Sequence, residues 1–272
     1  MQKYSSGLFG MFASLYRNRE LVFALAKRDA VGRYRGSIMG LAWSFFNPLL
    51  TLTVYTFVFS VVFKARWAGS DESKMDFAII LFAGMLVYGI FAECVSRAPT
   101  IIINNANYVK KVVFPLEILP WVSLLSALFH ALISLCVLLF VQLLLRQTLP
   151  ATVVLLPIVL VPLLLAVLGF SWFLAALGVY LRDIGHVTGL LVTVMLYMSA
   201  VFFPISALPE RFQFWLSLNP LAAVIEQSRQ VLIFGELPDV RSWLVLVLLG
   251  FAVAWLGFAW FQKTRKGFAD VL

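Results

Sequence analysis

Long runs of apolar residues dominate the chain, and short polar segments separate them. Six runs are close to or longer than the roughly 20 residues that an α-helix needs to cross a bilayer. They cover residues 38–63, 77–97, 116–145, 151–179, 187–204 and 242–262. Because the runs are continuous and do not alternate over ten-residue segments, they predict helices rather than the strands of a membrane barrel. The pattern therefore indicates an all-α integral membrane protein with six spanning helices.

The segment before the first run, residues 1–37, is basic and amphipathic. At helical spacing Leu21, Leu25 and Val31 fall on one side, opposite several arginines. This pattern is typical of a helix that lies in the membrane interface with its apolar side toward lipid. A basic segment that only fixes the topology is the alternative interpretation.

Between the fifth and sixth runs the chain is apolar but broken by prolines. We expect the stretch Leu208–Phe234 to form two short helices that dip back into the outer leaflet, with Pro220 near the turn between them. Backbone of this kind is tolerated at membrane depth only where protein buries it or where it lines a cavity. Glu226 and Arg229 are three residues apart on the second short helix, so they can pair with each other.

Composition and charge agree with this membrane class. The chain is 62% hydrophobic and 12% charged, far from the roughly 25% charged residues of a soluble domain. If both termini are cytoplasmic, the cytoplasmic segments hold 14 of the 21 lysines and arginines, as the positive-inside rule expects. We therefore predict one transmembrane domain, 1–272, with its core at 38–262 and a cytoplasmic tail at 263–272. The net charge of +8 follows from this topology and indicates no nucleic-acid partner.

Motifs for catalysis are missing from the sequence. No glycine is followed by lysine, so the GxxxxGK[ST] loop that binds ATP phosphates is absent. HExxH and GxSxG are also absent, and His130 and His186 lie in separate parts of the chain. His130 is either a buried hydrogen-bonding residue or a proton carrier. We predict no catalytic residue, no metal site and no cofactor in this chain, so any energy source must be a separate protein.

Three stretches resemble one family, the permease subunits of bacterial ABC exporters for lipid-linked polysaccharides such as O-antigen, capsule and teichoic acid. They are "RDAVGRYRGSIMGLAWSFFNPLL", "NNANYVKKVVFPLEILP" and "FFPISALPERFQFWLSLNPL". The third is similar to the wider exporter superfamily as well. The resemblance implies a homodimer of permeases in the bacterial inner membrane, bound to a dimer of ABC ATPase subunits that hold ATP and Mg²⁺. It also implies a substrate carried on undecaprenyl diphosphate.

The resemblance further implies that residues 104–113, here called the coupling segment, dock on the ATPase. A basic loop that only fixes topology is the alternative. The residues implied in the ATPase contact are Asn104, Asn105, Asn107, Tyr108, Lys110 and Lys111, with a smaller second contact at Arg182 and Asp183.

In this family the first and fifth spans border the transport path, where aromatic rings can act as platforms for sugars. A polar-to-aromatic face of the first span suits this position, although ordinary helix packing would also explain it. The implied path residues are Asn47, Thr51, Tyr55, Phe59, Tyr197 and Phe202. The implied external gate residues are Phe212, Trp215, Asn219, Pro220, Glu226 and Arg229.

Two other functions remain open at this point. One is a small-molecule or drug exporter of the same superfamily. The other is an integral membrane enzyme of glycan assembly, which would need a cluster of charged residues facing one leaflet; the external connections contain no such cluster.

Overall fold

The computed structural model describes residues 7–34, 36–40, 42–58, 74–110 and 114–272, and every regular element within these ranges is a helix. The all-α prediction is confirmed for this part of the chain. Four of its helical stretches are long and apolar enough to cross a membrane, and they coincide with the second, third, fourth and sixth predicted spans. They are Phe77–Thr100, Leu116–Arg146, Ala151–Tyr180 and Val240–Val271. Their main helices are α4 (Lys74–Arg97), α6 (Leu119–Arg146), α7 (Leu156–Tyr180) and α11 (Val240–Thr264).

The first and fifth predicted spans correspond to shorter helices. Helix α3 covers Ala42–Tyr55, and α8 covers Ile184–Met198. Gly36 and Gly40 have φ of +86° and +50°, a conformation that ends regular helix, so α3 begins later than the apolar run. α8 stops before the run does, because Ala200 has φ of +53°. The six-span count therefore stays a prediction, and residues 59–63 of the first span lie outside the described residues.

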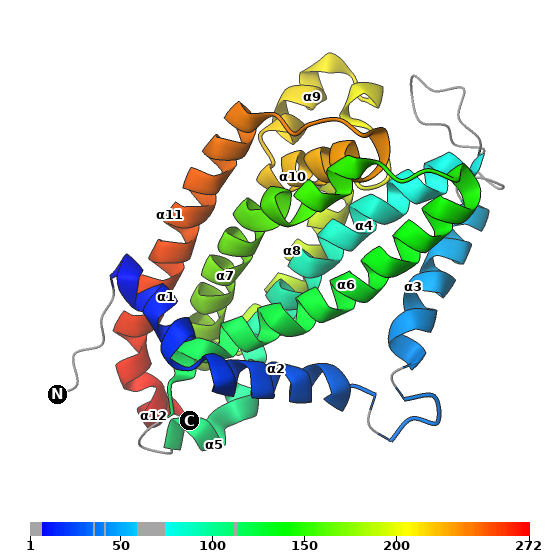
Figure 1. Ribbon diagram of the computed structural model, residues 1–272. Coiled ribbons are helices and arrows are strands. Elements are labelled where there is room, and N and C mark those ends of the chain that lie inside the picture. The colour runs from blue at the N-terminus through cyan, green and yellow to red at the C-terminus, as the bar shows by residue number, and fades with distance from the viewer. Residues whose placement is uncertain (1–6, 35, 41, 59–73, 111–113) are drawn as a thin grey trace.

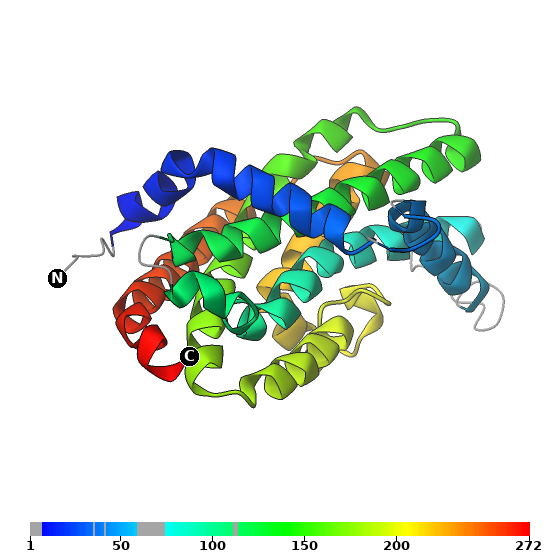
Figure 2. The same cartoon turned by 90° about the horizontal axis from the view of Figure 1, so that it is seen from below.

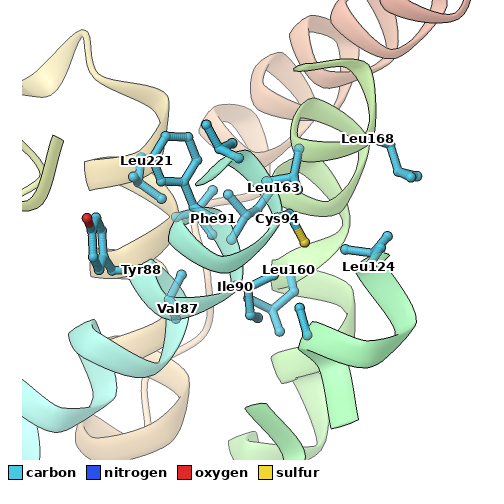
Figure 3. Packing of buried hydrophobic residues seen from close by; sticks show 14 of the residues in the cluster. Val87, Tyr88, Ile90, Phe91, Cys94, Leu124, Leu160, Leu163, Leu168 and Leu221 are labelled. Atoms are coloured by element: carbon cyan, nitrogen blue, oxygen red, sulfur yellow. The ribbon is translucent and has the colours of Figure 1, made fainter. Parts of the chain in front are cut away.

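Helix α4 is the centre of the bundle. In its apolar window 78% of the residues are buried inside the protein, the largest share among the four long helices of the described chain. Figure 3 shows Ile90 and Cys94 of α4 beside Leu160 and Leu163 of α7, with Leu221 of α10 nearby. A helix that is apolar on all sides is stable where either protein or lipid surrounds it. The neighbouring helices supply most of that cover for α4.

Helices α7 and α11 pack with their backbones in direct contact. A Cβ atom added to Gly257 would lie 2.0 Å from the carbonyl oxygen of Gly169, and one added to Gly169 would lie 2.3 Å from the carbonyl oxygen of Val253. Small residues at such crossings let membrane helices approach closely and gain van der Waals contact. The α7–α11 pair therefore depends on these glycines.

We expect the Gly257→Ala variant to unfold more easily than the wild type, by about 1–3 kcal/mol, because the new methyl group must force two backbones apart. Gly89→Ala in α4 is the matched control, since nothing lies within 4 Å of its added Cβ. The measurement is thermal unfolding of the purified variants in detergent. Equal melting temperatures for the two variants would contradict the close packing.

The bundle has two distinct ends. At the lower end in Figure 1 lie α2 (Arg19–Gly32), α5 (Ala106–Lys110), α12 (Phe268–Val271) and the C-terminus. At the upper end lie α9 (Glu210–Ser217) and α10 (Pro220–Arg229). The two short helices thus occupy the stretch expected for them, while their depth in the membrane stays a prediction.

The N-terminal amphipathic segment forms two helices, α1 (Leu8–Arg17) and α2, which meet at Asn18. Figure 2, seen from the lower end, shows α2 lying across the bundle helices. Its buried face contains Val22 and Leu25, and it packs against α6. The prediction that Leu25 faces lipid was wrong, because sequence spacing cannot distinguish a face covered by lipid from one covered by another helix.

Candidate functional site

The described part of the coupling segment, residues 104–110, lies in the 3-10 turn η3 (Ile103–Asn105) and in α5, at the lower end of the bundle. Asn104 and Asn107 are exposed, whereas Asn105 is half-buried and donates a hydrogen bond of 2.8 Å to the carbonyl of Ile101. Lys110 is the last residue of α5, and Lys111 lies outside the described residues. The segment therefore offers a short polar surface to a partner while its other side contacts the protein.

Tyr108 anchors this segment to the rest of the molecule. Its ring stacks on that of Phe114, with centroids 4.1 Å apart and planes 11° from parallel. Its hydroxyl accepts a hydrogen bond of 3.2 Å from Nη2 of Arg28 in α2. The helix predicted to lie in the interface is thus in direct contact with the coupling segment.

Two ion pairs hold α2 against the bundle. Arg97 of α4 donates two hydrogen bonds, of 2.8 and 2.7 Å, to the carboxylate of Asp29, the two-pronged arrangement that makes arginine–carboxylate pairs strong. Arg33 pairs with Glu93 of α4. Glu93 also lies 3.2 Å from Nδ1 of His130, which fits the interpretation of His130 as a buried hydrogen-bonding residue.

A cavity of about 310 Å³ opens where these elements meet. Arg28, Asp29, Arg97, Asn105 and Tyr108 contribute to its wall. At Asn104, Asn105 and Tyr108, which line this cavity, the coupling segment is separated from α4 and α6 by open space, so it has room to shift relative to them.

Burial of the Asp29 carboxylate acts to raise its pKa, but the hydrogen bonds and charge of Arg97, together with Ser126 and the charge of Arg33, outweigh this effect, so the pKa of Asp29 lies below its ordinary value. A lowered folded-state pKa means that the ionised group stabilises the fold at pH above its unfolded pKa. This contribution disappears as the pH falls through the folded pKa.

We therefore expect Asp29→Asn to lower the free energy of unfolding by about 1 kcal/mol near neutral pH and by less under acidic conditions. The measurement is chemical unfolding of purified protein at several pH values between neutral and strongly acidic. A stability loss that stays constant down to the lowest pH would contradict the role of the Asp29 charge.

The C-terminal part binds the residues that follow the coupling segment. Nη1 of Arg265 lies 2.5 Å from Oε2 of Glu117, and Nη2 donates a hydrogen bond of 3.1 Å to the carbonyl of Phe114. Both side chains of this ion pair are about nine-tenths buried or more, at 10% and 7% exposure. Sequence analysis missed Glu117 and Arg265, which are 148 positions apart. The only signal was that both charges lie at the ends of apolar runs.

The second predicted ATPase contact lies at this same end. Arg182 and Asp183 follow the lower end of α7, directly before α8, and both are exposed. The structure thus brings the two predicted contacts to one side of the molecule.

The predicted path residues partly come together. The ring of Phe202 lies 6.1 Å from that of Tyr55 in α3 and 5.7 Å from that of Tyr197 in α8, measured between centroids; we call these three residues the aromatic cluster. Asn47 is exposed and Thr51 is half-buried on α3. Phe59 lies outside the described residues. The cluster joins the two helices that were predicted to border the path.

The predicted gate residues separate into two groups. Phe212 and Trp215 of α9 are 46% and 66% exposed, and Glu226 is half-buried. Asn219 caps α10, since its Oδ1 accepts a hydrogen bond of 3.0 Å from the backbone of Leu221, with Pro220 as the first helical residue. Arg229, by contrast, has 0% exposure. It pairs with Glu226 at 3.3 Å as expected, but its side chain lies in the core of the protein.

Several known proteins are similar to this one over nearly the whole length of the chain. The profile of the ABC-2 type transporter family matches residues 20–233. An O-antigen export system permease protein of Myxococcus xanthus is 28% identical over 258 residues, which cover 94% of this chain and 96% of the relative. One from Klebsiella pneumoniae is 26% identical, with 93% and 95% covered. A polysialic acid transport protein of Escherichia coli is 20% identical, with 91% and 93% covered.

Proposed function

The chain belongs to the ABC-2 type transporter family, and we propose that it is the permease subunit of an ATP-driven exporter of lipid-linked polysaccharide, in particular O-antigen. One observation carries this proposal: the similarity to O-antigen export permeases extends over more than nine-tenths of both chains. The shared part is therefore a whole permease and not a single module. The chemistry of ATP belongs to a separate subunit, which binds ATP and Mg²⁺.

In this proposal the lower end faces the cytoplasm of the cell and docks on the ATPase. The exposed Asn104 and Asn107 form one contact, and Arg182 and Asp183 form the second. Because Tyr108 is bonded to Arg28, and Phe114 to Arg265, a movement of the coupling segment would pull on both α2 and the end of α11. Conformational changes of the ATPase would be transmitted to the helical bundle through these two connections.

The transport path lies between two copies of the chain in the inner membrane, since one bundle of this size has no room for a polymer. The aromatic cluster supplies faces on which sugars stack weakly, which suits a chain that must slide past. The lipid carrier is undecaprenyl diphosphate. α9 and α10 form the external gate, and both termini are cytoplasmic.

The test is to delete the gene and then to measure undecaprenyl-linked polymer in cell extracts and polysaccharide at the cell surface separately. Export predicts that the lipid-linked polymer accumulates inside while the surface polymer is lost. Normal surface polymer without accumulation would overturn the proposal in favour of a small-molecule exporter. Failure to make any lipid-linked polymer would favour an enzyme of glycan assembly.

A further inference from the structure

Arg229 is the largest polar side chain among the fully buried residues described here. Its guanidinium donates to three main-chain carbonyls: Nε to Ile80 at 3.2 Å, Nη1 to Ala200 at 2.9 Å and Nη2 to Val201 at 2.7 Å. A charged group is tolerated at such depth only when its donors are satisfied in this way. Gly84 provides the space for this guanidinium, because a Cβ atom at that position would lie 2.6 Å from Nη2 of Arg229.

Two of the carbonyls that Arg229 binds, those of Ala200 and Val201, belong to the stretch that follows α8, whereas the carbonyl of Ile80 belongs to α4. Helix α8 ends at Met198, and Ala200 adopts a positive φ, so the carbonyls at this end lose their partners within the helix. Nδ2 of Asn219 binds the beginning of the same stretch, with hydrogen bonds of 2.9 Å to the carbonyl of Met198 and 3.1 Å to Oγ of Ser199. Residues 198–201 are therefore bound by both ends of α10: by Asn219 at its N-terminus and by Arg229 at its C-terminus.

Phe202 follows this stretch directly, and its ring is the member of the aromatic cluster that contacts both Tyr55 and Tyr197. The position of the ring thus depends on the backbone that Arg229 and Asn219 hold. Lysine cannot replace this arrangement, because its ammonium group is a single point whereas the planar guanidinium presents donors in several fixed directions.

We propose that Arg229 is a positioning residue of the export path: by binding the carbonyls of Ala200 and Val201 it places the ring of Phe202 and makes α10 and the aromatic cluster move as one unit. The proposal rests on the proposed function in so far as the aromatic cluster borders the path. It adds that α10 and the sugar-contacting rings are connected through hydrogen bonds from the side chains of Asn219 and Arg229 to main-chain carbonyls.

The experiment compares Arg229→Lys with Arg241→Lys, an exposed arginine at the start of α11. Hydrogen–deuterium exchange is measured on the purified permease–ATPase complex in nanodiscs, and surface polymer and ATP hydrolysis are measured alongside. For Arg229→Lys we expect the amides of residues 199–203 to exchange at least about tenfold faster, with surface polymer reduced and ATP hydrolysis within about twofold of wild type. Arg241→Lys should change none of these.

Unchanged exchange at residues 199–203 in Arg229→Lys would overturn the proposal, and so would an equal rise in α4 and α7, which would indicate general loosening. If Arg229→Lys does not fold, Gly84→Ala replaces it, since the added methyl group displaces the guanidinium while the arginine remains. It should produce the same local exchange, and its failure to do so would equally overturn the proposal. The exchange measurement needs no glycan. If the wild-type protein exports no polymer while Arg229→Lys still raises the exchange of residues 199–203, the proposed function is refuted and the placement of this stretch by Arg229 stands.

Discussion

Replacing Tyr108 with alanine is expected to reduce surface polymer by about tenfold, because this half-buried ring joins the coupling segment to α2 and truncation of an aromatic anchor at an interface commonly has an effect of this size. The substitution removes the stacked contact with Phe114 and the hydroxyl that accepts from Arg28. The coupling segment would then lose its side-chain connection to α2, and movements of the ATPase would be transmitted less effectively, with the connection between Phe114 and Arg265 remaining. The measurements are surface polymer in cells and ATP hydrolysis by the purified complex.

Tyr108→Phe is the matched control for this prediction. It keeps the stacked ring and loses only the hydrogen bond to Arg28, so export should stay within about threefold of wild type, in line with the modest net value of one exposed hydrogen bond. Tyr16→Ala, which removes a 74% exposed tyrosine from α1, should leave export unchanged. Equal export by the alanine and wild-type proteins at position 108 would show that the ring does not connect the coupling segment to the bundle.

The second large effect is expected at the ion pair between Glu117 and Arg265. Glu117→Ala leaves the Arg265 guanidinium buried without its carboxylate, which typically costs about 3–5 kcal/mol of stability. The same change removes the contact between residue 117 and Arg265 at the end of α11, while the hydrogen bond from Arg265 to the carbonyl of Phe114 remains. The measurement is thermal unfolding of the purified protein in detergent.

The double variant Glu117→Leu with Arg265→Met distinguishes loss of the pair from loss of packing. Apolar replacements of similar volume often restore most of the stability of a buried ion pair, so this variant should melt well above Glu117→Ala. Glu236→Ala, an exposed acidic residue near the start of α11, should melt as the wild type does. A double variant no more stable than Glu117→Ala would contradict the buried-charge explanation.

The four long spans were predictable because lipid and a helical backbone set strict demands on sequence. A run of about 20 apolar residues predicts a spanning helix by itself, and helices at 77–100, 116–146, 151–180 and 240–271 follow those runs, even where α7 contains Pro162. The prolines between 204 and 238 predicted short helices, because proline interrupts helical hydrogen bonding wherever it occurs in a sequence. The residues of the coupling segment were recognisable as a polar, basic interruption between two apolar runs.

The pairings at the two ends were not predictable in this way. Asp29 and Arg97 are 68 positions apart, and both are ordinary members of a charged segment next to a membrane span. Arg229 was predicted to pair with Glu226, a neighbour at helical spacing, which is a local inference and was confirmed. Its bonds to Ile80, Ala200 and Val201 join elements far apart in the chain, so no local pattern contains them.

The sequence by itself determined that this protein is helical, that it crosses a membrane several times, and where most of its long helices run, because burial in lipid depends on stretches of neighbouring residues. Only the tertiary structure decided that Leu25 faces α6 and that Arg229 is buried as a partner of backbone carbonyls. The physical reason is that an apolar face is satisfied equally by lipid and by protein, and a charge equally by water and by hydrogen-bond acceptors. Which of them surrounds a given side chain depends on helices that pack together from distant parts of the chain.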